Sequence, residues 1–185
     1  MCVYFDKPGK DNTEKALDVM VDAIKQYGIK QVVVASTYGS TGLSAAERLK
    51  DMDVNLVVVT HNVGFKQPGT IEISPDMKAK LESLGAIVYT GTMPFRSIGT
   101  SIREKQGYSQ QDLIANTLRI LGQGLKVCVE IAMMASDAGL ITPDDVICVA
   151  GTARGADTVV QILPRPSNML FNLKVKRIFA KPVNW

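Results

Sequence analysis

The sequence has few of the residues that build metal centres, disulfide frameworks and membrane spans. Its 185 residues include 3 cysteines, 1 histidine and 1 tryptophan. The cysteines, Cys2, Cys128 and Cys148, are odd in number and far apart, so neither disulfides nor a structural zinc site is expected. No apolar run reaches the roughly 18 residues of a membrane span, and the opening residues do not have the pattern of a signal peptide. These absences predict a cytoplasmic protein without a bound metal or a membrane partner.

The excess of positive over negative charge is also small. A net charge of +3 is too small to indicate nucleic-acid binding, so no nucleic-acid partner is expected. The lysines of residues 173–176 alternate with apolar residues, which is typical of the solvent face of an edge strand. With 46% apolar and 21% charged residues, the chain has the composition of an ordinary globular protein. Its length predicts a single domain over residues 1–185.

Short apolar runs with the composition of β-strands recur along the chain, and helical patterns separate most of them. The runs cover residues 2–5, 31–35, 55–60, 86–90, 145–150, 158–163 and 173–180. Asp11 or Asn12 can cap a helical pattern that stops at Gly28. Another pattern begins at Ser74, where a proline follows the capping serine. The longest helical region opens at Ser109. The alternation predicts an α/β fold with parallel strands and an antiparallel element at the end.

A loop rich in hydroxyls and glycines follows the run at residues 31–35, and a helical pattern follows the loop at once. It contains Ser36, Thr37, Gly39, Ser40, Thr41 and Gly42. Free backbone N–H groups and a helix dipole at such a turn favour an anion, and a phosphate is the natural occupant. No lysine follows the glycines as in a Walker A loop, and their spacing is not that of a dinucleotide fingerprint. A polar turn that binds nothing is the alternative.

Two more strand ends carry polar loops that contain glycine. One loop includes Thr60, His61 and Gly64, and the other includes Gly151, Thr152, Ala153, Gly155 and Asp157. Ligands of open α/β sheets collect at the carboxyl ends of the strands. If the three strands are neighbours, the three loops line one crevice.

Two titratable residues are candidates for acid–base chemistry. His61 is the only histidine and follows a strand, so it is a candidate acid or ligand contact. The alternative is a loop histidine that bonds a neighbouring carbonyl. Glu130 lies in an apolar helical run and needs a partner, either Lys126 four residues earlier or donors from a loop. A structural role that ties down a loop is the favoured interpretation of Glu130.

Residues 92–108 show no clear hydrophobic period and carry Arg96 and Arg103. Long loops in compact domains are uncommon unless they serve a site. We therefore expect a mobile flap whose arginines approach the phosphate when it closes. A surface insertion or an oligomer contact is the alternative.

Several motifs resemble the C-terminal α/β domain of pyruvate kinase. Residues 36–41 resemble the loop that holds one phosphate of that domain's sugar bisphosphate effector, and residues 145–155 resemble its later strand and G-x-x-x-G loop. The chain is similar, over nearly its whole length, to a group of small stand-alone proteins with that fold. The motifs that carry this similarity are residues 5–13, 59–61, 123–132 and 135–140.

The resemblance implies a three-layer α/β/α fold with a mixed five-stranded sheet, in the order 3-2-1-4-5 with the fifth strand antiparallel. It also implies flavin mononucleotide (FMN) or a similar phosphorylated ligand in the crevice. In this arrangement the loop with Ser36 holds the phosphate, residues 60–64 contact the middle of the ligand, and residues 151–157 approach its ring, with Asp157 at a polar edge. The barrel domain and the catalytic apparatus of pyruvate kinase are missing, so no kinase activity is expected.

We therefore expect a binding protein for a phosphorylated small molecule, with FMN as the first candidate. One alternative is a flavin-dependent enzyme, or an enzyme of phosphorylated metabolites, that uses His61 or Glu130. The other is an assembly module with an incidental crevice, since the related domain of pyruvate kinase takes part in oligomer contacts. A homo-oligomer is expected in either case.

Overall fold

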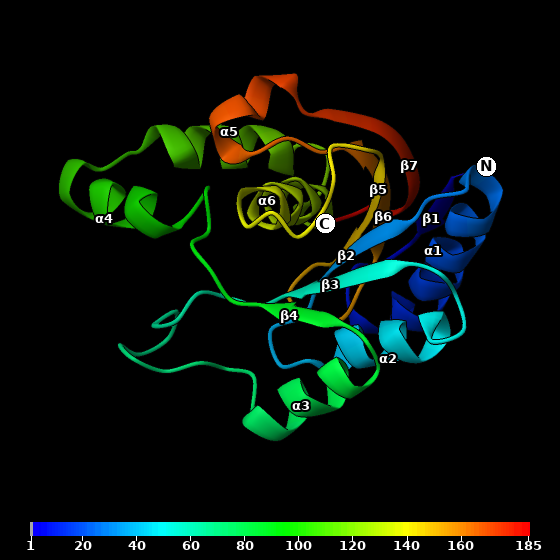
Figure 1. The fold of residues 1–185 in the computed structure, drawn as a ribbon. Helices are drawn as coiled ribbons and strands as arrows, with labels where there is room; N and C mark the ends of the chain where they lie inside the picture. The colour runs from blue at the N-terminus through cyan, green and yellow to red at the C-terminus, as the bar shows by residue number, and fades with distance from the viewer. Residues whose placement is uncertain (1) are drawn as a thin grey trace.

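A seven-stranded mixed sheet forms the centre of the computed structural model, which describes residues 2–185 (Figure 1). The strands are β1 (Val3–Phe5), β2 (Gln31–Ala35), β3 (Asn55–Val59), β4 (Ile87–Tyr89), β5 (Val146–Ala150), β6 (Thr158–Leu163) and β7 (Lys174–Pro182). They lie in the order β1-β7-β6-β5-β2-β3-β4. The pairs among β4, β3, β2 and β5 are parallel, β6 is antiparallel to β5 and β7, and β1 is parallel to β7.

Helices flank both faces of the sheet (Figure 1). They are α1 (Thr13–Tyr27), α2 (Ser40–Leu49), α3 (Pro75–Ser83), α4 (Ser97–Gln106), α5 (Gln110–Arg119) and α6 (Gln123–Asp137), with the 3-10 turns η1 (Lys10–Asn12) and η2 (Ser167–Asn172). Helices α1, α2 and α3 cover one face, and α5 and α6 cover the other.

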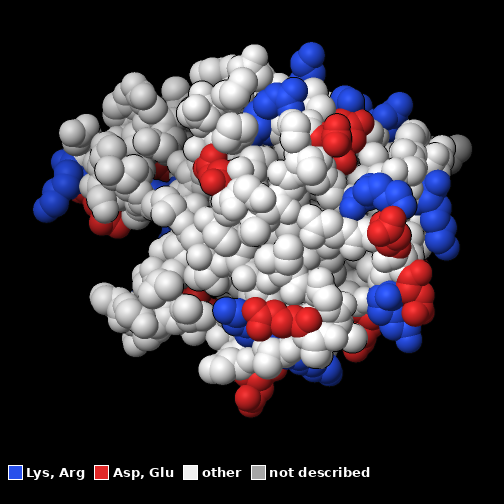
Figure 2. All heavy atoms as spheres, in the orientation of Figure 1, with Lys and Arg blue, Asp and Glu red and all other residues white. Residues whose placement is uncertain are grey.

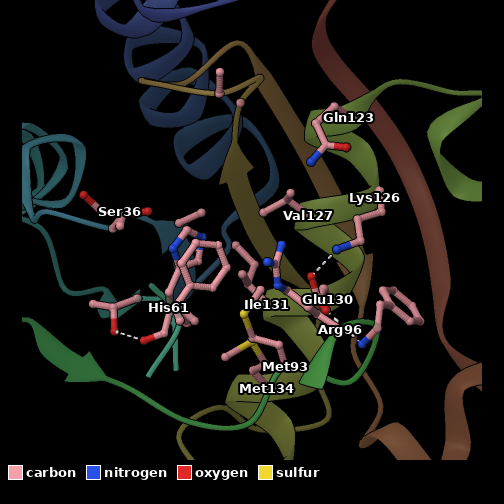
Figure 3. A pocket seen from close by; sticks show the side chains of 18 of the residues that line it. Ser36, His61, Met93, Arg96, Gln123, Lys126, Val127, Glu130, Ile131 and Met134 are labelled. Carbon is pink, nitrogen blue, oxygen red and sulfur yellow. Dashed lines mark hydrogen bonds and ion pairs between the residues drawn. The ribbon is translucent and has the colours of Figure 1, made fainter. Parts of the chain in front are cut away.

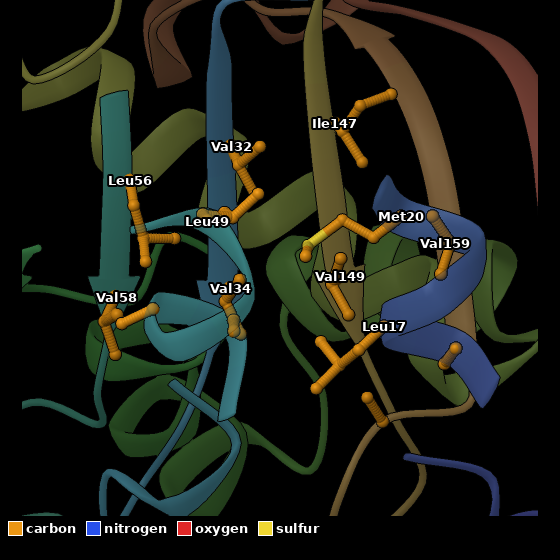
Figure 4. Packing of buried hydrophobic residues seen from close by; sticks show 14 of the residues in the cluster. Leu17, Met20, Val32, Val34, Leu49, Leu56, Val58, Ile147, Val149 and Val159 are labelled. Carbon is orange, nitrogen blue, oxygen red and sulfur yellow. The ribbon is translucent and has the colours of Figure 1, made fainter. Parts of the chain in front are cut away.

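Strand β2 shows how the two faces are filled. Val32 and Val34 point into the core on the α1 side, where they join a cluster with Leu17 and Met20 (Figure 4). Val33 points to the opposite face and packs in the cluster formed with α6. All three valines are fully buried. A strand covered on both faces reads as a continuous apolar run, which explains the Val-rich sequence.

The expected count of five strands is wrong, because the sheet has seven. The two additional strands come from the chain ends. Strand β7 pairs with β6 along most of its length, and its last residues, from Ala180 to Pro182, pair with β1. The five strands β4-β3-β2-β5-β6 nevertheless follow the expected order, and β6 has the expected antiparallel direction.

The segment of residues 92–108 contains a regular helix, α4, which the sequence pattern did not reveal. The reason is that α4 has no apolar stripe: its only buried residue is Gly99. A Cβ atom at Gly99 would lie 2.7 Å from Cβ of Gln111, so this glycine lets α4 approach α5 closely. The long helical region after Ser109 is also divided. It breaks into α5 and α6 at Gly122, whose φ of 123° is one that glycine adopts readily.

Within residues 2–185, no helix combines the length and the apolar character needed to cross a bilayer. The same range holds no cluster of three or more His, Cys, Asp or Glu side chains suited to a metal ion. Cys128 and Cys148 are buried free thiols, and burial raises the pKa of both.

Candidate functional site

A cavity of about 650 Å³ opens where β2, β3 and β5 end. It lies between α4 and the segment that follows β3, and Figure 2 shows a hollow between these parts of the surface. Strand β2 lies between β3 and β5. After β2 the sheet grows on one side through β3 and β4, and the later strand β5 adds to the other side of β2, so the strand order reverses at β2. Such a reversal is where open α/β sheets bind ligands, and the volume lies within the roughly 300–1,000 Å³ usual for small-molecule sites.

The hydroxyl loop forms one wall of the cavity at the N-terminus of α2. Gly39 is the N-cap, and its φ of 93° turns the chain into the helix. The Gly42 amide donates to Oγ of Ser36 at 3.1 Å. The amides of residues 37–41 donate no hydrogen bond to any residue that the structure describes. Several N–H groups and the positive end of the helix dipole are therefore available at one wall.

Most of the expected site residues line the same cavity. They are Ser36, Thr37, Ser40, Thr41, Thr60, His61, Glu130, Gly151, Ala153 and Gly155. The structure thus brings together the three loops that the sequence places far apart. Ala153 has a φ of 65°, the one positive value for a non-glycine residue in the described chain. Such backbone strain is common in loops that build a binding site.

Five expected residues lie outside the cavity wall: Gly39, Gly42, Gly64, Thr152 and Asp157. Two of these glycines are needed for packing. A Cβ atom at Gly42 would lie 2.7 Å from Cγ1 of Val58, and one at Gly39 would lie 2.2 Å from Cγ of Met77. Gly42 therefore lets α2 pack on β3.

The Asp157 carboxylate is fully buried and already occupied by protein donors. Its Oδ2 accepts the amides of Gly9 and Thr152, both at 3.0 Å, and its Oδ1 accepts the hydroxyl of Thr158 at 2.8 Å. The side chain fixes the loop after β5 against the N-terminal segment. It shapes the cavity from behind and does not face it.

His61 lies at the start of the loop after β3, in a stack of aromatic rings. Its ring stacks on Phe65 with the centroids 3.7 Å apart, and the Arg96 guanidinium lies 4.2 Å from the Phe65 centroid. Burial, with a smaller contribution from Arg96, lowers the His61 pKa below its usual 6.5. Nδ1 is buried and has no hydrogen-bond partner among the described residues. At neutral pH the ring is uncharged and has a polar atom without a partner.

Glu130 has both of the partners that the sequence offered as alternatives (Figure 3). Its Oε1 accepts the Phe95 amide at 2.8 Å, and its Oε2 pairs with Lys126 one turn earlier on α6. Both side chains are buried. Burial lowers the pKa of Lys126, although Glu130 opposes that effect. Glu130 thus ties the start of the α4 segment to α6, as the structural interpretation predicts.

Cations outnumber carboxylates around the cavity. The charged residues that line it are Arg96, Arg103, Arg119, Lys126, Arg154, Asp112 and Glu130. Arg103 pairs with Asp112 at 3.2 Å, and Lys126 pairs with Glu130. The other three arginines form no ion pair with the described residues. The cavity therefore keeps an excess of positive charge that suits an anionic ligand.

The lining residues that the sequence analysis missed include Phe65, Arg119, Gln123 and Arg154. Arg119 lies on α5 and donates from Nε to Oε1 of Gln123 at 2.7 Å, across the break between the two helices. Only the tertiary position of that break brings this pair to the cavity, so no sequence pattern reveals it. Arg154, by contrast, lies inside the expected loop after β5, and its charge was an available signal.

Comparisons with known proteins leave the family open. No family model matches the chain. Among solved structures, it is similar to an O-ureido-L-serine synthase at 18% identity and a TM-score of 0.33, over 56% of this chain and 32% of that one. It is also similar to a pyridoxal 5'-phosphate-dependent aspartate racemase at 18% identity and a TM-score of 0.34, over 76% of this chain and 47% of that one. The chain thus spans less than half the length of either protein, and neither similarity assigns a function.

Proposed function

We propose that this protein binds a phosphorylated small molecule, with FMN as the first candidate, in the cavity at the carboxyl ends of β2, β3 and β5. The single observation that carries the proposal is the wall at the N-terminus of α2. There, Thr37, Tyr38, Ser40 and Thr41, whose amides donate no hydrogen bond to a described residue, and the hydroxyl-bearing Ser36 line a cavity with excess positive charge. Amides and hydroxyls at a helix N-terminus are donors that suit a phosphate.

The rest of the cavity offers apolar surface for the flat ring of FMN. Met93, Phe95, Ile131 and Met134 supply apolar surface, and His61 has a buried Nδ1 without a partner among the described residues. Ligand sites combine such apolar walls with a few polar groups that fix orientation. The order of the five strands β4-β3-β2-β5-β6 also supports the resemblance to the C-terminal domain of pyruvate kinase. That family assignment remains part of the proposal.

Flavin fluorescence provides the test. Purified protein, freed of bound small molecules, is titrated with FMN and with riboflavin, which lacks the phosphate. We expect FMN to bind more tightly, since a hydrogen bond to a charged group is worth about 1.5–3 kcal/mol. Thr41→Ala should weaken FMN binding and leave riboflavin binding unchanged. Equal affinities for the two flavins would contradict the phosphate site, and no binding of either would exclude FMN as the ligand.

A further inference from the structure

Lys126 carries a buried ammonium group for which the described residues supply only one hydrogen-bond acceptor. The residue is 5% exposed, and it lines the cavity. Of its three N–H donors, one is used by Glu130, and no other acceptor among the described residues bonds to Nζ. Nζ also lies 5.6 Å from the centroid of the Phe95 ring. Buried donors without acceptors are costly, so two N–H groups beside an open cavity indicate a ligand acceptor.

The surrounding charges favour an acceptor that carries negative charge. Arg119 and Arg96 both act on Lys126 electrostatically, and neither has a carboxylate partner among the described residues. The negative charge of Glu130 forms an ion pair with Lys126 and with neither arginine. Its Oε1 is also occupied by the Phe95 amide. A ligand oxygen that carries partial or full negative charge would therefore be stabilised next to Nζ.

Lys126 and the cavity wall at the N-terminus of α2 lie on different sides of the sheet. Helix α2 packs in the cluster that contains α1, whereas α6 packs in the cluster on the opposite face. In Figure 3, Ser36 and Lys126 lie on opposite sides of the cavity, with His61 and Arg96 between them. A ligand that extends from the N-terminus of α2 to Lys126 would therefore cross the edge of the sheet.

We infer that Lys126, oriented by Glu130, binds an oxygen acceptor at the end of the ligand opposite its phosphate. This inference rests on the proposed function and narrows the ligand class. The ligand has a phosphate at one end and a carbonyl, enolate or carboxylate oxygen at the other. FMN, whose ring has carbonyl oxygens at its far edge, is one member of this class. Lys126 is then a residue that determines specificity, and Glu130 positions it.

A matched pair of ligands tests the inference. 6-Phosphogluconate and glucitol 6-phosphate have the same carbon chain and phosphate, and differ in a terminal carboxylate against a hydroxyl. Calorimetry measures both affinities in the wild type and in Lys126→Met/Glu130→Gln. This double variant removes both charges and keeps an acceptor for the Phe95 amide. Lys80→Met, which changes an exposed lysine of α3, is the control.

We expect the wild type and the control to prefer the carboxylate ligand by about 10- to 100-fold, the range for a hydrogen bond to a charged group. The preference should fall close to one in the double variant. A purely structural role for the pair would change both affinities equally and leave their ratio intact. That result, or the lack of a preference in the wild type, would overturn the inference.

Failure of the proposed function gives a different pattern. If FMN does not bind but the 6-phosphogluconate preference depends on Lys126, the choice of FMN is wrong and the inference stands. If FMN binds and the two sugar phosphates do not, the FMN affinity of the double variant decides. A loss of about tenfold or more supports the inference, and a smaller change overturns it. If no phosphorylated probe binds, both proposals fail.

Discussion

Removing the Glu130 carboxylate should destabilise the protein strongly, and removing Lys126 as well should restore most of the loss. Glu130 is 1% exposed, and it is the one acceptor for the buried Lys126 ammonium among the described residues. Breaking one partner of a buried ion pair costs about 3–5 kcal/mol. For a chain of this size, that corresponds to a melting temperature lower by about 6–20 °C.

Two substitutions separate the sources of this loss. Glu130→Leu leaves both the Lys126 charge and the Phe95 amide without an acceptor, and the amide alone costs about 1–3 kcal/mol. Glu130→Gln keeps an oxygen for the amide, so its smaller loss measures the unpaired charge. With Glu130 gone, the folded-state pKa of Lys126 falls further below the unfolded value. The unfolded state then binds more protons, so the deficit of Glu130→Gln should shrink as the pH rises.

Urea unfolding of the wild type, Lys126→Met, Glu130→Gln and the double variant Lys126→Met/Glu130→Gln completes the cycle. Because the double variant contains no buried charge at this site, we expect its free energy of unfolding within about 2 kcal/mol of the wild type. A double variant as unstable as the sum of its single variants would refute the reasoning. So would a loss below about 1 kcal/mol in Glu130→Leu.

Three other predictions follow from the site. Gly42→Val should lower the melting temperature, because the new side chain would clash with Val58. Thr41→Ala should keep the melting temperature of the wild type and lose FMN affinity, and equal melting temperatures of the two variants would contradict this prediction. The His61 ring proton resonance should titrate below pH 6.5, because burial lowers the pKa of His61 in the folded protein. The neutral ring's contribution to stability should therefore be lost as the pH falls from 6.5 through this lowered pKa, and titration at 6.5 or above would contradict the prediction. Hydrogen exchange of residues 92–108 should slow selectively when FMN binds, and equal protection in both states would exclude a flap.

The strands were predictable because burial on two faces leaves a clear mark on the sequence. Each of the seven strands overlaps an apolar run, including β1 and β7, whereas the family resemblance implied only five. Helix α4 was not predictable, because it buries a single glycine and so has no hydrophobic period. Local patterns report burial, and an element that buries little leaves little pattern.

The site could be located from the sequence more easily than its contacts could be assigned. The loops with Ser36, His61 and Gly151 were identified because each follows a buried strand, and β2 pairs with both β3 and β5. Gly42 and Asp157, however, serve packing and the loop backbone instead of facing the cavity. A glycine needed for close packing and a glycine needed for a ligand look identical in a sequence. Only the packed structure separates them.

The central claim is that a phosphate binds at the N-terminus of α2, and a crystal structure of the protein with FMN tests it most directly. We predict electron density for the phosphate within hydrogen-bond distance of the amides of residues 37–41 and of the Thr41 hydroxyl. The ring should lie toward Lys126. A phosphate bound elsewhere, or FMN bound outside this cavity, would contradict the account.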